Sequence, residues 1–131
     1  MDRDAYISQV RTLMDSRKIS DALALSDRYT KMHPEDAEGW RYRAHVFEIT
    51  RDFSQAIAAM SEAIRLSPRE PGYRWLRGMF YFRAGFNNEA EQDMTKTIQL
   101  GAQAESTYYD EVAHLLRAET YRRMGQADRA R

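Results

Sequence analysis

The sequence contains no cysteine and only three prolines in 131 residues. The absence of cysteine excludes disulfides, thiolate catalysis and cysteine-based metal sites. The chain also lacks a surplus of either charge, because 20 Lys and Arg residues balance 20 Asp and Glu residues. A protein with a dedicated nucleic-acid surface normally has a basic excess, so this balance argues against nucleic acid as a partner.

Long apolar runs are missing as well. No stretch approaches the ~18 apolar residues of a membrane span, and the N-terminal "MDRDAYISQV" carries charges where a signal peptide is apolar. We therefore expect a cytoplasmic chain that has no membrane partner. The residues that are present, 43% hydrophobic and 31% charged, are typical of a folded globular protein. The length predicts a single domain over residues 1–131.

Similar residues recur at a fixed interval. Ala22, Ala56 and Ala90 lie 34 positions apart. Four more columns keep this spacing, namely Leu13, Phe47 and Tyr81; Ser20, Ser54 and Asn88; Pro34 and Pro68; and Met32, Leu66 and Leu100. A shifted copy follows in Tyr121, Gly125, Asp128 and Ala130. Five columns at one spacing indicate an internal repeat.

Each repeat is predicted to be a pair of helices. In the second repeat Trp40, Ala44 and Phe47 follow the i, i+4, i+7 spacing of one helix face, and the apolar pattern resumes at Ala56. The small alanines let the paired helices approach closely, and the prolines end the repeats because proline cannot continue a helix. We expect Trp40, Phe47 and Tyr81 to lie in the core.

The turn inside each repeat has its own pattern. Gly85 occupies the end of the first helix, a position that favours a left-handed backbone. Asn88 is predicted to be the N-cap of the next helix, with Glu91 in reciprocal contact. Ser20, Ser54 and Asp128 are the N-caps predicted for the other repeats.

This pattern resembles the tetratricopeptide repeat family, whose repeat is a 34-residue helix pair. The residues that carry the resemblance are Trp40, Ala44, Phe47, Ala56, Ala63, Pro68, Gly78, Tyr81, Gly85, Ala90 and Leu100. The resemblance implies an all-α solenoid of stacked antiparallel helix pairs, a right-handed superhelix. The repeats are predicted at residues 3–36, 37–70 and 71–104, with a partial fourth at 111–131. Arg17 replaces glycine in the first repeat, as in a capping repeat.

Residues with catalytic potential form no convincing site. Arg43, Arg77 and Arg117 share a column, and the resemblance implies that each arginine faces an acid on its own second helix, such as Asp93 for Arg77. The three histidines have no zinc-ligand spacing, and the paired carboxylates stand at helix starts, where acids complement the helix dipole. Glycine-rich phosphate loops and nucleophile elbows are absent. We predict no catalytic residue, no metal and no cofactor, and hence no enzyme.

One stripe beside the predicted core is a candidate ligand surface. Trp75, Met79 and Phe82 follow i, i+4, i+7, and the resemblance implies that this stripe lines a concave groove; coverage of Trp75 by the neighbouring repeat is the alternative. The matching residues are Ile7, Arg11 and Met14; Arg41, His45 and Glu48; and Leu115, Glu119 and Arg122, with Arg83 beside the third stripe.

These features predict a non-catalytic scaffold or adaptor that binds a peptide or protein segment in its groove. The alternative is a regulatory or substrate-recruiting domain of a larger enzyme or sensor. The family's chaperone-tail clamps resemble a groove lined by Lys and Asn that binds a terminal carboxylate. The stripes here carry arginine and histidine instead, which argues against that subtype, and an arginine-based carboxylate site is the remaining alternative. We expect the helix at 107–124 to expose Leu115, Leu116, Tyr121 and Met124, and the chain to form a homodimer through its solenoid ends or to fray after Gly125 unless that helix is the cap.

Overall fold

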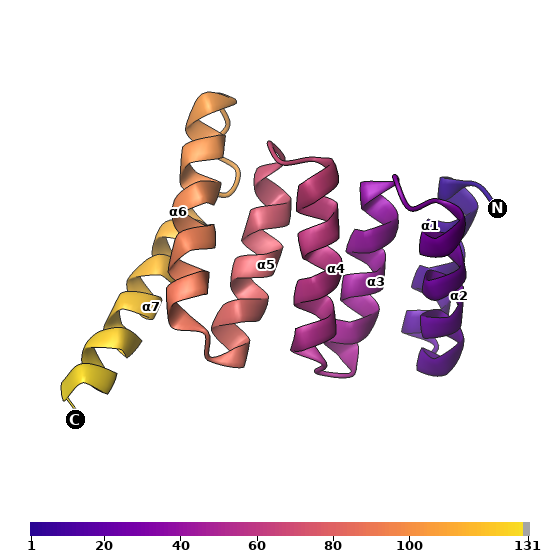
Figure 1. Cartoon of the computed structure of the whole chain (residues 1–131), viewed down its shortest axis with the longest axis horizontal. Coiled ribbons are helices and arrows are strands. Elements are labelled where there is room, and N and C mark those ends of the chain that lie inside the picture. Colours follow the sequence, from indigo (N-terminus) through magenta and orange to yellow (C-terminus); the bar gives the residue numbers. More distant parts are fainter. Residues whose placement is uncertain (130–131) are drawn as a thin grey trace. The chain divides into compact units, whose positions relative to one another are not determined.

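The computed structural model describes the backbone of residues 1–129 and the side chains of residues 1–126, and this part of the chain forms seven α-helices and no strand (Figure 1). The helices are α1 (Arg3–Asp15), α2 (Ile19–Met32), α3 (Ala37–Ile49), α4 (Phe53–Leu66), α5 (Pro71–Ala84), α6 (Asn87–Gln103) and α7 (Asp110–Arg129). The all-α fold of a helical repeat solenoid is therefore confirmed. Two compact units divide at Pro68, with α1–α4 in unit one and α5–α7 in unit two. The single domain over residues 1–131 stays a prediction.

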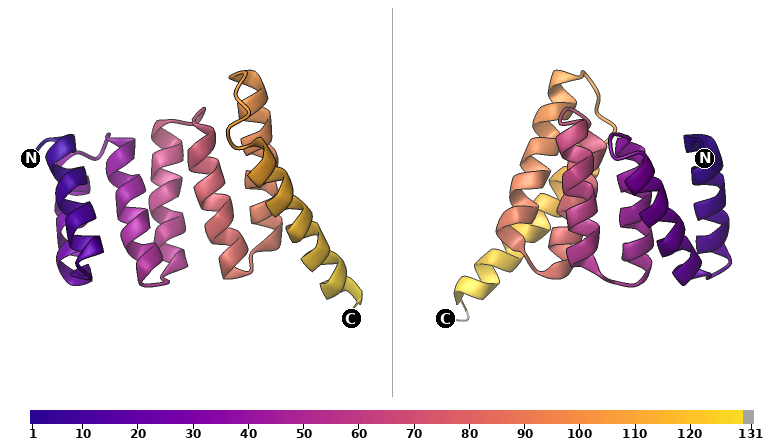
Figure 2. Two further views of the ribbon diagram at one scale, coloured as in Figure 1. Left: turned by 180° about the vertical axis from the view of Figure 1, so that it is seen from behind. Right: turned by 45° about the vertical axis from the view of Figure 1, so that its right-hand side comes forward.

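Unit one is a stack of four antiparallel helices. Each helix packs on the next, and the two first helices of the repeats, α1 and α3, also contact each other directly (Figure 2). Ala22 and Ala56 are completely buried, as the repeat columns predicted. Because these side chains are small, the paired helices approach closely where they cross.

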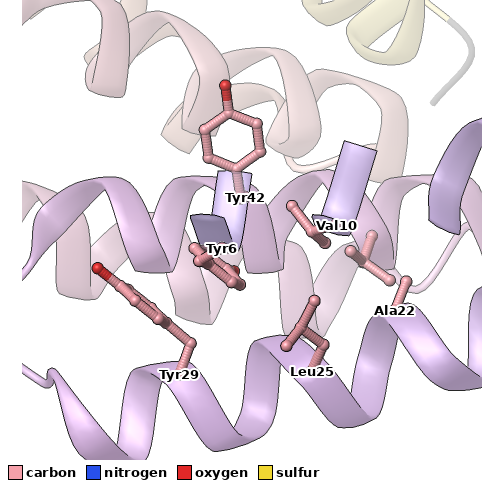
Figure 3. Close-up of a cluster of buried hydrophobic side chains, with 7 residues drawn as sticks. Tyr6, Val10, Ala22, Leu25, Tyr29 and Tyr42 are labelled. Atoms are coloured by element: carbon pink, nitrogen blue, oxygen red, sulfur yellow. The ribbon is translucent and has the colours of Figure 1, made fainter. Parts of the chain in front are cut away.

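The core of unit one is rich in tyrosine (Figure 3). The rings of Tyr6 and Tyr29 stack with centroids 3.9 Å apart and 3° between their planes. The Tyr29 hydroxyl donates to Asp36 Oδ2 at 2.5 Å, and the Tyr6 hydroxyl donates to the Gly39 carbonyl at 3.1 Å. Burial, followed by the bond to Asp36, raises the pKa of Tyr29 to about 12, so this phenol stays a neutral donor. The stack fixes both rings between α1 and α2.

The aromatic residues predicted for the core are not its fully buried members. Trp40, Phe47 and Tyr81 are only half-buried. The fully buried positions lie one residue earlier on α3 and α5, at Val46 and Phe80. The core stripe was predicted one residue away from its true position, so this prediction was wrong in register. A helix turns about 100° per residue, and the neighbouring stripe on these helices is also apolar.

The turns inside the repeats contain a left-handed residue every 34 positions. Arg17, Arg51 and Gly85 have φ values of 60°, 59° and 88°. After Gly85, the Phe86 N–H donates to the Tyr81 carbonyl at 2.9 Å, a bond that ends the helix with a left-handed residue. Asp52 makes the equivalent bond to Phe47 at 3.0 Å. The left-handed residue predicted at Gly85 is confirmed.

The predicted N-caps were wrong by two residues. The left-handed residue reverses the chain so sharply that the next helix begins only two residues after it, earlier than predicted. The N-caps are Lys18, Asp52 and Phe86 rather than Ser20, Ser54 and Asn88. Asp52 accepts from the Gln55 N–H at 3.2 Å. Glu91 does not pair with Asn88; its carboxylate accepts from Thr95 and Tyr121.

Arg51 is expected to destabilise its own turn. A left-handed backbone costs a non-glycine residue about 1 kcal/mol, and the Arg51 guanidinium offsets this only through an exposed contact with Phe53, 5.7 Å from the ring centre. Arg51→Gly should therefore raise the free energy of unfolding by about 0.5–1 kcal/mol in urea titrations. Gly85→Ala, at the equivalent position with no neighbour near the added methyl group, should lower it by about 1 kcal/mol. A loss of stability in Arg51→Gly would contradict the idea that the backbone is strained there.

Unit two pairs α5 with α6 and adds α7 against α6. Residues 104–109 connect α6 to α7, a longer connection than those between the earlier repeats. The turn predicted at Gly125 and the N-cap predicted at Asp128 are wrong, because α7 continues through both to Arg129. Ala130 and Arg131, which the fourth repeat was predicted to include, lie outside the described residues.

Candidate functional site

One depression in unit one lies between the two first helices. It is an open hollow of ≈ 560 Å³ lined by α1, the turn after it and α3. We call it the arginine hollow, and its lining residues are Arg11, Met14, Asp15, Arg17, Arg41, Tyr42, His45, Glu48 and Ile49. The three candidate residues predicted on α3, Arg41, His45 and Glu48, therefore lie together.

The floor of the arginine hollow is the ring of Tyr42. The guanidiniums of Arg41 and Arg11 lie 4.6 and 5.5 Å from the ring centre. The His45 ring approaches it edge-on, with the ring centroids 6.1 Å apart. Cations over an aromatic face are attracted by its quadrupole. Tyr42 itself is only 4% exposed, so this buried ring keeps the positions of the charged groups around it.

Two carboxylates hold the polar side chains of α3 in place. Glu38 accepts from Arg41 Nε at 2.7 Å and from Arg41 Nη2 at 2.8 Å, and these bonds raise the pKa of Arg41 above its usual range. Glu48 lies 3.3 Å from His45 Nδ1. Arg41 is thus a fixed wall of the hollow. Arg41 and His45 already have carboxylate partners on α3, so an anionic ligand would have to bind other cationic side chains of the hollow.

Arg11 and Arg17 supply those other cations. Both side chains are exposed, and within the described part of the chain neither makes an ion pair. The sequence placed Arg11 on the inner stripe, but it gave no signal for Arg17, which reaches the hollow because its left-handed backbone turns the chain there. Ile49 was also missed, although it is 37% exposed and continues the same face of α3.

The predicted apolar stripe of unit two is half-buried. Trp75, Met79 and Phe82 all lie on α5 with intermediate exposure. The Tyr109 ring lies 6.5 Å from Trp75. Arg123 covers Phe82, since its guanidinium is 3.4 Å from the ring centre and its Nη1 donates to the Phe82 carbonyl at 2.7 Å. Trp75 is thus partly covered by the connection before α7, and Met79 and the open edge of Trp75 are what the stripe offers to a ligand.

The remaining candidates of unit two are exposed. Glu119 and Arg122 pair with each other on α7, and Arg83 is exposed at the end of α5. On α7, Leu115 is 63% and Tyr121 50% exposed. Leu116 and Met124, expected to be exposed with them, are half-buried.

The arginine column is a set of packing contacts. Arg77 makes the predicted pair with Asp93 on its own second helix, with Nε to Oδ2 and Nη2 to Oδ1 distances of 2.8 Å each. The other two arginines differ from the prediction because they reach back to the preceding second helix. Arg43 bonds Asp27 at 3.1 Å, and Arg117 bonds Thr95 Oγ1 at 3.3 Å.

No cluster of three or more His, Asp or Glu side chains that could hold a metal ion occurs among residues whose placement is described. Across the same residues, none of the helices combines the length and the apolar character that spanning a bilayer demands.

Solved structures with this arrangement of helices are numerous. The TPR2B domain of yeast Sti1 in its complex with pHsp70 has a TM-score of 0.83 at 16% identity and covers 92% of this chain and 96% of that one. The Yersinia enterocolitica chaperone SycD in complex with a peptide of the translocator YopD has 0.80 at 14% identity, with 92% and 93% covered. The Sgt2 TPR domain from Aspergillus fumigatus has 0.80 at 17% identity, with 96% and 81% covered.

These identities are low, so the likeness establishes the fold alone. Comparison with curated protein sequences gives no match. The sequence itself matches the family model described as "Tetratricopeptide repeat" over residues 7–71 and again over residues 45–105. The two matches span most of the chain and agree with the 34-residue columns, and the chain therefore belongs to the tetratricopeptide repeat family.

Proposed function

We propose that this chain is a non-catalytic scaffold that binds an extended segment of a partner protein along the inner faces of its first helices. The arginine hollow is the observation that carries the proposal. It is open, it lies between α1 and α3, and it combines exposed arginines with apolar side chains from Met14 and Ile49. Solenoids present extended faces of this kind to peptides.

The chemistry of the lining favours a segment that carries an acidic residue beside an apolar one. Arg11 and Arg17 have no carboxylate partner and would bind the acid, preferably in the two-pronged geometry that guanidinium and carboxylate share. Met14 and Ile49 would contact the apolar side chain. Asp15 and Glu48 also line the hollow, so the acids of a bound segment would lie on the side of Arg11 and Arg17.

Unit two has a candidate contact surface of its own. Met79 and the exposed edge of Trp75 would hold a bulky apolar anchor, with Arg83, Glu119 and Arg122 as polar surroundings. The relatives support a peptide ligand in general terms, because structures similar to this chain contain pHsp70 and a YopD peptide. Their contacts are not transferred, since the similarity is in the fold.

The proposal is tested with peptides selected on the full chain from a random phage-displayed library. We expect selected sequences to share an acidic residue next to an apolar one, and calorimetric titration to show at least tenfold weaker binding to Arg11→Glu and to Trp75→Ala, since anchors of this kind dominate peptide interfaces. Arg28→Glu is the matched control, because Arg28 is exposed on α2 and does not line the hollow.

Thermal unfolding of each variant must stay close to that of the wild type for the comparison to count. Equal binding by the wild type and Arg11→Glu would remove the arginine hollow from the ligand site. Normal binding by Trp75→Ala alone would remove the α5 stripe and leave the hollow.

A further inference from the structure

The chain itself carries a segment with the composition that the arginine hollow favours. Residues 97–116 contain no Lys or Arg, but they include Glu105, Asp110 and Glu111. Tyr108, in the middle of these acids, is 80% exposed. Val112 and Leu115 follow on α7 and are 41% and 63% exposed. We call residues 104–115 the acidic loop.

The base of the acidic loop is held in position. Glu105 has a left-handed backbone with φ 53°, and the Ser106 N–H donates to the Gly101 carbonyl at 2.8 Å. The Tyr108 ring packs edge-on against Tyr109, with centroids 4.7 Å apart. A large apolar ring that is supported on one side and mostly exposed loses little conformational freedom when it binds, which favours binding.

The two surfaces are complementary in charge and in size of side chain. Of the three arginines that line the arginine hollow, Arg41 is already paired with Glu38, but Arg11 and Arg17 make no ion pair within the described part of the chain. The acidic loop has three carboxylates, no Lys or Arg, and one histidine, His114. Opposite charges arranged in this way steer association and fix its orientation.

We propose that the arginine hollow of one copy of this chain binds the acidic loop of a second copy. The proposal rests on the hollow as the ligand site proposed above and names its occupant. Tyr108 contacts Met14 and Ile49, while Glu105 and Glu111 pair with Arg11 and Arg17. The contact joins two different surfaces, so it forms a reciprocal pair if two copies close on each other and a longer assembly if they do not.

Self-association of the full chain is the first test. Sedimentation velocity from low micromolar to millimolar concentration should show a concentration-dependent increase in mass, and raising the salt should weaken it because the arginines and acids are exposed. A wild-type chain that stays monomeric over this range overturns the proposal, even if it still binds library-selected peptides. That outcome would leave the proposed function standing.

Charge reversal is the second test and locates the contact. The double variant Arg11→Glu/Arg17→Glu and the double variant Glu105→Lys/Glu111→Lys should each self-associate at least tenfold more weakly than the wild type. A mixture of the two should recover association, because each hollow then meets a loop of opposite charge. Arg28→Glu and Glu89→Lys, which change exposed charges elsewhere, should leave self-association unchanged.

Two results contradict the inference here. One is wild-type association that survives both double variants, which would place the interface on another face. The other is a mixture that stays as weak as its components while circular dichroism shows both variants folded. Peptide binding that is normal in Glu105→Lys/Glu111→Lys but lost in Arg11→Glu/Arg17→Glu keeps the two proposals separate, since only the hollow is needed for a foreign ligand.

Discussion

Asp93→Ala is expected to lower the free energy of unfolding by about 3 kcal/mol, because it removes the acid from a largely buried ion pair and leaves the cation unpaired. Asp93 is only 1% exposed. Its carboxylate accepts two bonds of 2.8 Å from Arg77 and a third of 3.3 Å from Arg74. The bond to Asp93 raises the pKa of Arg77. An arginine side chain stays charged at neutral pH even without such a bond, so Asp93→Ala leaves a cation without its partner.

A double-mutant cycle in urea measures the pair itself. The losses in the free energy of unfolding for Arg77→Ala and Asp93→Ala should sum to more than the loss for the double variant. We expect the difference, which is the coupling energy, to be about 1–3 kcal/mol, because either single change leaves a charged group without its partner. Glu119→Ala is the matched control. Glu119 pairs with Arg122 on the exposed side of α7, so its loss should leave the free energy of unfolding nearly unchanged. Strictly additive losses for Arg77 and Asp93 would show that their contact contributes nothing specific.

Gly39→Ala should destabilise the protein by up to about 2 kcal/mol, although alanine is the better helix former. A methyl group on Gly39 would lie 2.8 and 2.9 Å from two ring atoms of Tyr29. The ring cannot move aside, because it is stacked on Tyr6 and its hydroxyl is bonded to Asp36. Overpacking of a fixed core costs about 1–3 kcal/mol, which exceeds the ~1 kcal/mol that alanine gains in a helix.

Gly125→Ala is the matched control for that substitution. Gly125 also lies inside a helix, and nothing lies within 4 Å of the added methyl group. This change should stabilise the protein by about 0.5–1 kcal/mol. Thermal melts of both variants test the pair. Stabilisation by Gly39→Ala would mean that the tyrosine stack can rearrange, and destabilisation by Gly125→Ala would mean that this part of α7 is not helical in solution.

Three features that the sequence predicted correctly depend on local geometry. The 34-residue columns predicted helix pairs, the buried alanines and the left-handed Gly85, because side-chain size and backbone freedom act within one or two turns of a helix. The Arg77–Asp93 pair was also predicted, since both residues belong to the same helix pair and only the resemblance to the family was needed to orient them.

Other features were predicted with the wrong register or partner. The core stripe was displaced by one residue at Phe47 and Tyr81, because neighbouring faces of these helices are both rich in apolar side chains. Arg43 was assigned to its own repeat but bonds Asp27 of the preceding one. A shared column predicts the position of an arginine on its helix. It does not predict which of the two adjacent helices the long side chain contacts.

The sequence by itself determined the class and the period of this protein, since a helix pair every 34 residues follows from local apolar spacing and turn chemistry. The tertiary structure decided which inner-face residues have partners. Glu38 pairs with Arg41, Glu48 lies 3.3 Å from His45 Nδ1, and Tyr109 and Arg123 cover part of Trp75 and Phe82. Within the described part of the chain Arg11 and Arg17 make no ion pair, although Asp15 lines the same hollow, so their charges stay exposed. Pairing between residues on different helices is settled only when the helices pack.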